Sequence, residues 1–200
     1  MNPLGLMRRI VQVTVPGLFL SLTACGGNME APKIEINHEA KEQYEVLLHI
    51  EGVAGPFDLV EAQVNYSIEN EDCVPPAPFS GARDIPRKVL PLSLQKVAVD
   101  TYKGIVAIDA IKDANYFGQG ICRWKLIAVS VDLRRRNTTF HAAVFHDDLM
   151  SERGSVSYFP GEAYRRNEIT RLVSGAMDIK ELETPNDAFS LRIGTKEIRK

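Results

Sequence analysis

The sequence predicts an all-β protein, an antiparallel β-sandwich with long loops and one disulfide. Apolar and polar residues alternate with a period of two along much of the chain, which is typical of strands that bury one face. Pro, Gly, Asn and Asp separate these segments, and no long segment has the spacing of an amphipathic helix. Strands of this kind are stable when two sheets pack face to face, so the pattern favours a sandwich.

The clearest strand is expected over residues 59–68, and an earlier one over residues 44–50. Residues 90–94 alternate as well, and Pro91, which has no amide proton, marks that segment as an edge strand or a bulge. The other expected strands cover residues 99–109, 120–133, 138–145, 155–159, 169–173 and 189–193.

The longest expected strand, residues 120–133, is apolar on both faces. Strict alternation places one set of side chains on one face, namely Cys122, Trp124, Leu126 and Ala128. It places a second set on the opposite face, namely Ile127, Val129, Val131 and Leu133. Residues 134–137 then read as a turn into the following strand.

The N-terminus has the order of a secretory signal. Arg8 and Arg9 precede an apolar stretch that ends in Leu22-Thr23-Ala24-Cys25. This ending resembles the lipobox of bacterial lipoproteins, in which the chain is cut before the cysteine and a diacylglycerol is attached to its sulfur; an ordinary signal with an incidental cysteine is the alternative. The resemblance implies that residues 1–24 are a signal peptide and that Cys25 is lipidated. Gly26 stands where an Asp would indicate retention in the inner membrane, so the expected location is the periplasmic face of the outer membrane.

The expected lipid anchor and the composition lead to expectations for the tether, the domain and the partners of the rest of the chain. Residues 25–42 are expected to form a flexible tether, and residues 43–200 a single domain. An acyl anchor holds the protein on the membrane, and no other segment needs to bind lipid. Residues 1–24 contain two of the 24 basic residues and none of the 26 acidic ones, so the mature chain has a net charge of −4. This charge gives no basic excess for binding nucleic acid.

Two cysteines remain after Cys25, namely Cys73 and Cys122. An exported protein folds in an oxidising compartment, which favours a disulfide between them. The alternative is a metal-binding pair, although no CxxC motif and no nearby cluster of histidines accompanies them.

The sequence offers no catalytic motif. It contains no HExxH, no GxSxG and no phosphate-binding glycine loop, and no cofactor is expected. Residues 146–148, His-Asp-Asp, could hold a metal or could end a strand as solvated acids, and we favour the second interpretation. The acidic residues at 69–72 are interpreted as a solvated loop. We therefore predict that the protein is not an enzyme and has no metal site.

Three loops remain as candidates for binding a partner. The first, over residues 113–118, contains Tyr116 and Phe117. The second is the turn with Arg134, Arg135 and Arg136, and the third is the long segment 146–168 with Tyr158 and Phe159. Aromatic and arginine side chains often dominate protein interfaces. The alternatives are packing against the core for the aromatic residues and simple solvation for the arginines.

Several short motifs lie between Asn65 and Trp124, and they are NYSI, CVPP, SGAR, DTYKG, NYFG and GICRW. This stretch resembles periplasmic lipoproteins that are immunity factors against antibacterial effectors of contact-dependent secretion, especially type VI phospholipases and lipases. The resemblance implies a secreted toxin as the partner and inhibition by occlusion of its active site. The alternative is a non-enzymatic structural or assembly lipoprotein of the cell envelope.

Overall fold

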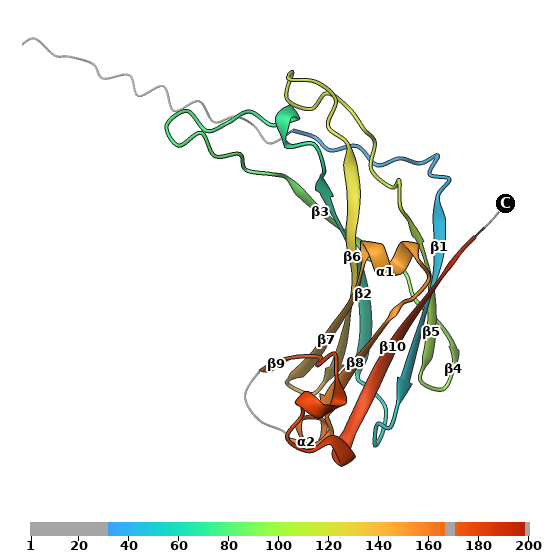
Figure 1. Ribbon diagram of the computed structural model, residues 1–200. Helices are drawn as coiled ribbons and strands as arrows, with labels where there is room; N and C mark the ends of the chain where they lie inside the picture. The colour runs from blue at the N-terminus through green and yellow to red at the C-terminus, as the bar shows by residue number, and fades with distance from the viewer. Residues whose placement is uncertain (1–31, 167–170, 199–200) are drawn as a thin grey trace, which may run out of the picture. The chain divides into compact units, whose positions relative to one another are not determined.

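The computed structural model describes residues 32–166 and 171–198. The predicted signal peptide and Cys25 lie outside these residues. In the described part the chain forms ten strands in two packed sheets, which confirms the predicted β-sandwich with one disulfide (Figure 1).

The first sheet has the strand order β4-β5-β1-β10-β8, and all its neighbouring strands are antiparallel. Its strands are β1 (Gln43–Glu51), β4 (Gln95–Ala98), β5 (Thr101–Ala107), β8 (Ser155–Pro160) and β10 (Ala188–Glu197).

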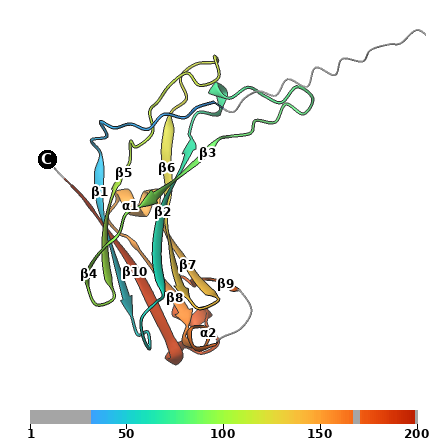
Figure 2. The ribbon, with the colours of Figure 1, turned by 180° about the vertical axis from the view of Figure 1, so that it is seen from behind.

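The second sheet has the order β3-β2-β6-β7-β9 (Figures 1 and 2). Its strands are β2 (Leu59–Ile68), β3 (Arg87–Leu92), β6 (Trp124–Arg135), β7 (Thr138–Phe145) and β9 (Arg171–Ser174). β9 pairs in parallel with β7, which departs from the predicted antiparallel arrangement. The reason is the path of the chain: after β7 it returns along the other sheet as β8, so β9 starts at the same end as β7.

The core lies between the two sheets, where the alternating side chains of both meet. Its central members are buried residues of β1, β2, β6, β7 and β10. Tyr66 spans the layers, because its hydroxyl donates a hydrogen bond to the carbonyl oxygen of Ala107 on the opposite sheet (2.6 Å). Burial raises the pKa of this phenol above its usual value.

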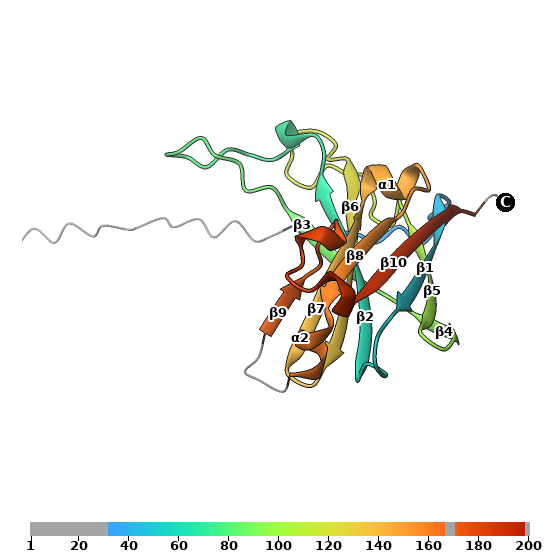
Figure 3. The ribbon, with the colours of Figure 1, turned by 60° about the horizontal axis from the view of Figure 1, so that its bottom comes forward.

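α2 (Gly161–Arg165) lies at the lower end of the sandwich in Figures 1 and 3. Its Tyr164 belongs to a cluster of aromatic rings with Phe57, Phe140, Phe159 and Phe189. The ring of Phe189 stacks on Phe159 at 5.1 Å and meets Phe140 edge-on, also at 5.1 Å. Tyr164 of α2 donates a hydrogen bond to the carbonyl of Pro56 and so holds the helix against the sandwich. The expected long segment 146–168 is therefore structured over its described residues as α1 (His146–Met150), β8 and α2.

A β-bulge in β6 changes the predicted face assignment. Asn65 of β2 pairs with Ala128 and the next residue, Tyr66, pairs with Leu126, so Ile127 has no partner across the ladder. The extra residue reverses the alternation. Leu126 consequently shares the core face with Val129, although strict alternation predicted that these two residues would lie on opposite faces.

The edge strands agree only partly with the predictions. β3 is an edge strand of the second sheet, as Pro91 indicated. The expected strand 99–109 starts later, because Val99 and Asp100 form the turn between β4 and β5; Asp100 has a φ of 57°. β4 itself was not predicted, and all four of its residues are exposed, so it lacks the buried alternation that identifies a strand in a sequence.

The predicted tether is wrong in its second half, where residues 34–42 are fastened to the domain. Ile36 forms a β-bridge with Ile111, and the amide of Asn37 donates to the carbonyl of Ala110. The carboxylate of Asp109 accepts hydrogen bonds from the amides of Lys41 and Glu42. The domain boundary at residue 43 therefore has to move toward the N-terminus.

The helices of the described residues are short. α1 and α2 have five residues each, and the remaining helical turns are 3-10 turns of three residues, η1 (Glu71–Cys73), η2 (Ile179–Glu181) and η3 (Pro185–Asp187). Among these residues no helix has the length and apolar character needed to cross a membrane.

Candidate functional site

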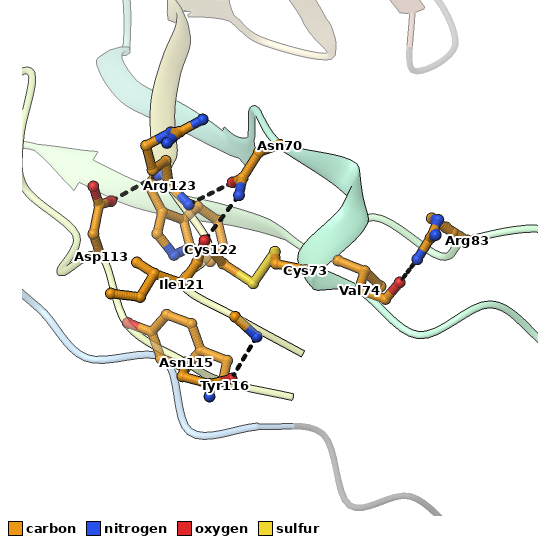
Figure 4. Close-up of a disulfide and its surroundings, with 12 residues drawn as sticks. Asn70, Cys73, Val74, Arg83, Asp113, Asn115, Tyr116, Ile121, Cys122 and Arg123 are labelled. Carbon is orange, nitrogen blue, oxygen red and sulfur yellow. Dashed lines mark hydrogen bonds between the residues drawn. A yellow bond between two sulfur atoms is a disulfide. The ribbon is translucent and has the colours of Figure 1, made fainter. Parts of the chain in front are cut away.

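The predicted disulfide is present at the upper end of the second sheet (Figure 4). Cys73 in η1 and Cys122, two residues before β6, are joined with a Cα–Cα distance of 5.3 Å. Both are fully buried in a small cluster with Ile68 and Val74, separate from the main core. The bridge therefore fixes the loops that leave β2 and enter β6.

Polar side chains complete the pairing where the ladder between β2 and β6 ends. The Asn70 side chain donates to the carbonyl of Ile121 (2.8 Å) and accepts from the amide of Arg123 (2.7 Å). The carboxylate of Asp113 accepts from the amide of Trp124 (2.9 Å). These contacts are drawn in Figure 4, and they hold the loop over residues 108–123 against η1.

Tyr116 and Phe117, two of the predicted contact residues, lie at this end and are half-buried. The Tyr116 hydroxyl donates to the carbonyl of Lys112 (2.7 Å) and accepts from the amide of Glu35 (3.3 Å). Its ring meets Trp124 edge-on at 6.3 Å. Both residues pack against the disulfide cluster, so they support the loop, and a contact with a partner stays a prediction.

The connection between η1 and β3, the 74–86 loop, was not among the predicted sites. It stands away from the sandwich in both side views (Figures 1 and 2). Its tip carries Phe79, whose relative exposure is 104%. The signal in the sequence was a phenylalanine outside any period-two strand, in the proline-rich segment Pro75-Pro76-Ala77-Pro78-Phe79.

The 74–86 loop is ordered by its own hydrogen bonds. At the tip the amide of Ala77 donates to the carbonyl of Ala82 (2.8 Å), and the amide of Gly81 donates to the carbonyl of Ala77 (3.0 Å). Gly81 adopts a φ of 69°, which a glycine reaches without strain. At the base the guanidinium of Arg83 donates to the carbonyl of Val74 and lies 3.5 Å from the carboxylate of Asp72.

The arginine turn lies at the other end of β6. β6 has twelve residues, and at about 3.3 Å per residue its two ends are roughly 36 Å apart. The three arginines therefore do not join Tyr116 and Phe117 in one surface. The seven predicted contact residues form separate groups.

Acidic neighbours offset the charge of the arginine turn. Arg134 pairs with Glu61 (3.2 Å), and Arg135 pairs with Asp58 (2.8 Å). The amide of Arg136 donates to the same Asp58 carboxylate. The hydrogen bond from this amide is the largest effect on the Asp58 carboxylate, and with the help of Arg135 it holds the pKa of Asp58 below its usual value against the opposing effect of desolvation. These pairs weaken the predicted role of the turn in attracting an acidic partner.

The prediction that Phe159 contacts a partner is wrong in this structure. Its side chain is fully buried among the aromatic rings of the lower core. Alternation along β8 places the neighbouring Tyr158 on the outer face, where it is half-buried. Its backbone pairs with Ala176 through two hydrogen bonds of 2.9 Å.

A shallow groove of about 290 Å³ lies on the outer face of the second sheet. Three of its polar side chains are already engaged within the domain. Glu61 pairs with Arg134, Asp132 with His141 (2.7 Å), and Ser130 accepts from Asn65 (3.0 Å). Across residues 32–166 and 171–198 no group of three or more His, Cys, Asp or Glu side chains is arranged to hold a metal.

Comparisons with protein families, with functionally characterised proteins and with solved structures found no match for this chain.

Proposed function

We propose that this chain is a lipid-anchored immunity protein on the periplasmic face of the outer membrane. In this proposal it binds a secreted antibacterial effector of the phospholipase or lipase type and occludes the active site. The anchor is the Cys25 lipid, inferred from Leu22-Thr23-Ala24-Cys25. The partner class comes from the resemblance of residues 65–124 to immunity lipoproteins.

The observation that carries the proposal is the disulfide-fixed end of the sandwich, from which the 74–86 loop projects. An inhibitor has to place a protrusion in or over a cleft, and loops on a rigid sheet can do this. The Cys73–Cys122 bridge and the Asn70 hydrogen bonds order this end before binding. Because the loops are already ordered, they lose less conformational entropy when a partner binds.

A protection assay tests the proposal. Lipases and phospholipases secreted by the source organism's contact-dependent system are exported, one at a time, to the periplasm of a sensitive strain. We expect the full chain to restore growth against one of them and to inhibit that enzyme in membrane extracts. A Cys25→Ser variant keeps the described domain unchanged and should protect less, because it is no longer held at the membrane.

The competing function predicts a different outcome. If the protein is a structural lipoprotein of the envelope, its deletion weakens the envelope in cells that carry no effector, and its expression relieves no toxicity. Detergent sensitivity of the deletion strain measures the first effect. Detergent sensitivity without protection against any secreted enzyme would contradict the immunity proposal.

A further inference from the structure

We infer that the 74–86 loop is the anchor of the interface, and that Phe79 enters an apolar pocket of a partner protein. This inference rests on the proposed function and adds to it the residue that binds and the chemistry of the surface that receives it.

The first argument is the exposure of Phe79. Its side chain contacts none of the described core and is 104% exposed, the highest value among the large apolar residues of the described chain. Burying a phenylalanine side chain is favourable, because it removes apolar surface from water. The described fold does not bury the Phe79 side chain, so a partner that covers this side chain obtains the stabilisation.

The second argument is the rigidity of the loop. Pro75, Pro76 and Pro78 restrict the backbone before the tip, and hydrogen bonds from Ala77 to Ala82 and from Gly81 to Ala77 close it. The base is held by Arg83 and by the disulfide. A ring presented on such a loop loses little conformational freedom on binding.

The third argument is the distribution of charge along the loop. Residues 74–82 contain no charged side chain, whereas the base carries charges of both signs, on Glu71, Asp72, Arg83, Asp84 and Arg87. Interfaces commonly have this arrangement, with an apolar anchor at the centre and a polar rim. The partner is therefore expected to offer an apolar pocket that accepts an aromatic ring, inside a polar rim.

The same features favour a protein over a lipid surface. One aromatic side chain gives too little buried area for membrane binding, which needs a larger apolar face. We therefore assign the loop to a protein pocket, and insertion into lipid becomes an outcome that the experiment can detect.

The first experiment places a photo-crosslinking amino acid, p-benzoylphenylalanine, at position 79 of the full chain in cells that produce the effector. The control places it at Val99, which is 80% exposed on the β4–β5 turn at the opposite end of the sandwich. We expect a crosslink to the effector from position 79 and none from position 99. A phospholipid adduct at position 79, or equal crosslinking from both positions, would overturn the inference.

The second experiment titrates that effector with full-chain variants. Phe79→Ala should weaken binding by about 30- to 1,000-fold, and Phe79→Trp should retain most of the affinity. Phe145→Ala is the matched control, because Phe145 is an exposed phenylalanine on the outer face of β7. Phe79 lies outside the core, so its loss should leave the circular dichroism spectrum unchanged.

The results separate the two proposals. If the parent protein neither binds nor protects against any secreted enzyme, the proposed function fails. If the parent protects and Phe79→Ala binds as tightly as Phe145→Ala, only the assignment of Phe79 fails.

Discussion

Without the Cys73–Cys122 bridge, the end of the sandwich that holds it should unfold at a lower urea concentration than the rest of the domain. The bridged residues are 49 positions apart, and for a closed loop of this length the chain-entropy treatment gives a stabilisation of about 4 kcal/mol. Replacing both cysteines with alanine also removes two buried sulfur atoms from the small cluster around Ile68. We expect a loss of about 3–5 kcal/mol in the free energy of unfolding.

Trp124 makes the local effect measurable. It is the only tryptophan of the chain and packs against both the disulfide cluster and the main core, so its fluorescence reports on the place where the two meet. Circular dichroism reports on the strands of both sheets. In the Cys73→Ala, Cys122→Ala variant, the fluorescence transition in urea should precede the dichroism transition. In the parent protein the two transitions should coincide, as in two-state unfolding.

A Cys25→Ser variant serves as the control, because it removes a cysteine outside the described domain and should leave both transitions unchanged. The reasoning would be refuted by a stability loss below about 1 kcal/mol in the double variant. Coincident transitions in the double variant would refute the local part of the argument.

Four further predictions follow from single sites. Gly154→Ala should lower the free energy of unfolding by at least about 2 kcal/mol, because Gly154 has a φ of 65° and a Cβ there would lie 2.2 Å from a carbonyl oxygen of β10. Gly118 has a φ of 74° but open space around it, so Gly118→Ala should lower the free energy of unfolding by only about 1 kcal/mol. Urea unfolding measures both. Phe159→Ala should destabilise by about 3–5 kcal/mol in the same assay, since its ring is fully buried. The pKa of Asp58 is lowered in the folded protein, so its contribution to stability is present above its unfolded pKa of about 3.8 and is lost as the pH falls through the folded value. In thermal melts, the difference in Tm between Asp58→Asn and the parent should therefore be larger at pH 6 than at pH 2.5. The mass of the mature protein extracted from membranes should exceed that of residues 25–200 by an acyl-lipid adduct on Cys25, and an unmodified mass would disprove lipidation.

Much of the fold could be predicted from local pattern. Period-two alternation located β2 and β7 to the residue, and Pro91 identified an edge strand. The disulfide was predicted from two remaining cysteines in a chain that is expected to be exported. Each of these features depends on residues close in sequence or on the compartment, so a single sequence contains the necessary information.

The candidate site could be predicted only in part. The sequence identified the loop of Tyr116 and Phe117 next to Cys122, and the structure places both at the cross-linked end. Local pattern did not settle which of the candidate aromatic side chains are exposed and which are buried. Phe159 turned out to be core and Phe79 surface, because the atoms that cover a side chain come from distant parts of the chain.

By itself the sequence predicted an export signal, which stays a prediction, and it predicted the strand-rich domain and the disulfide between Cys73 and Cys122, which the structure contains. The tertiary structure alone decided the bulge at Ile127, which exists only relative to the partner strand β2 and brings Leu126 and Val129 to one face. It also decided that Arg135 is paired with Asp58, a residue 77 positions away. Alternation states which side chains share a face, but the pairing of strands and charges across the sheet is a property of the folded chain.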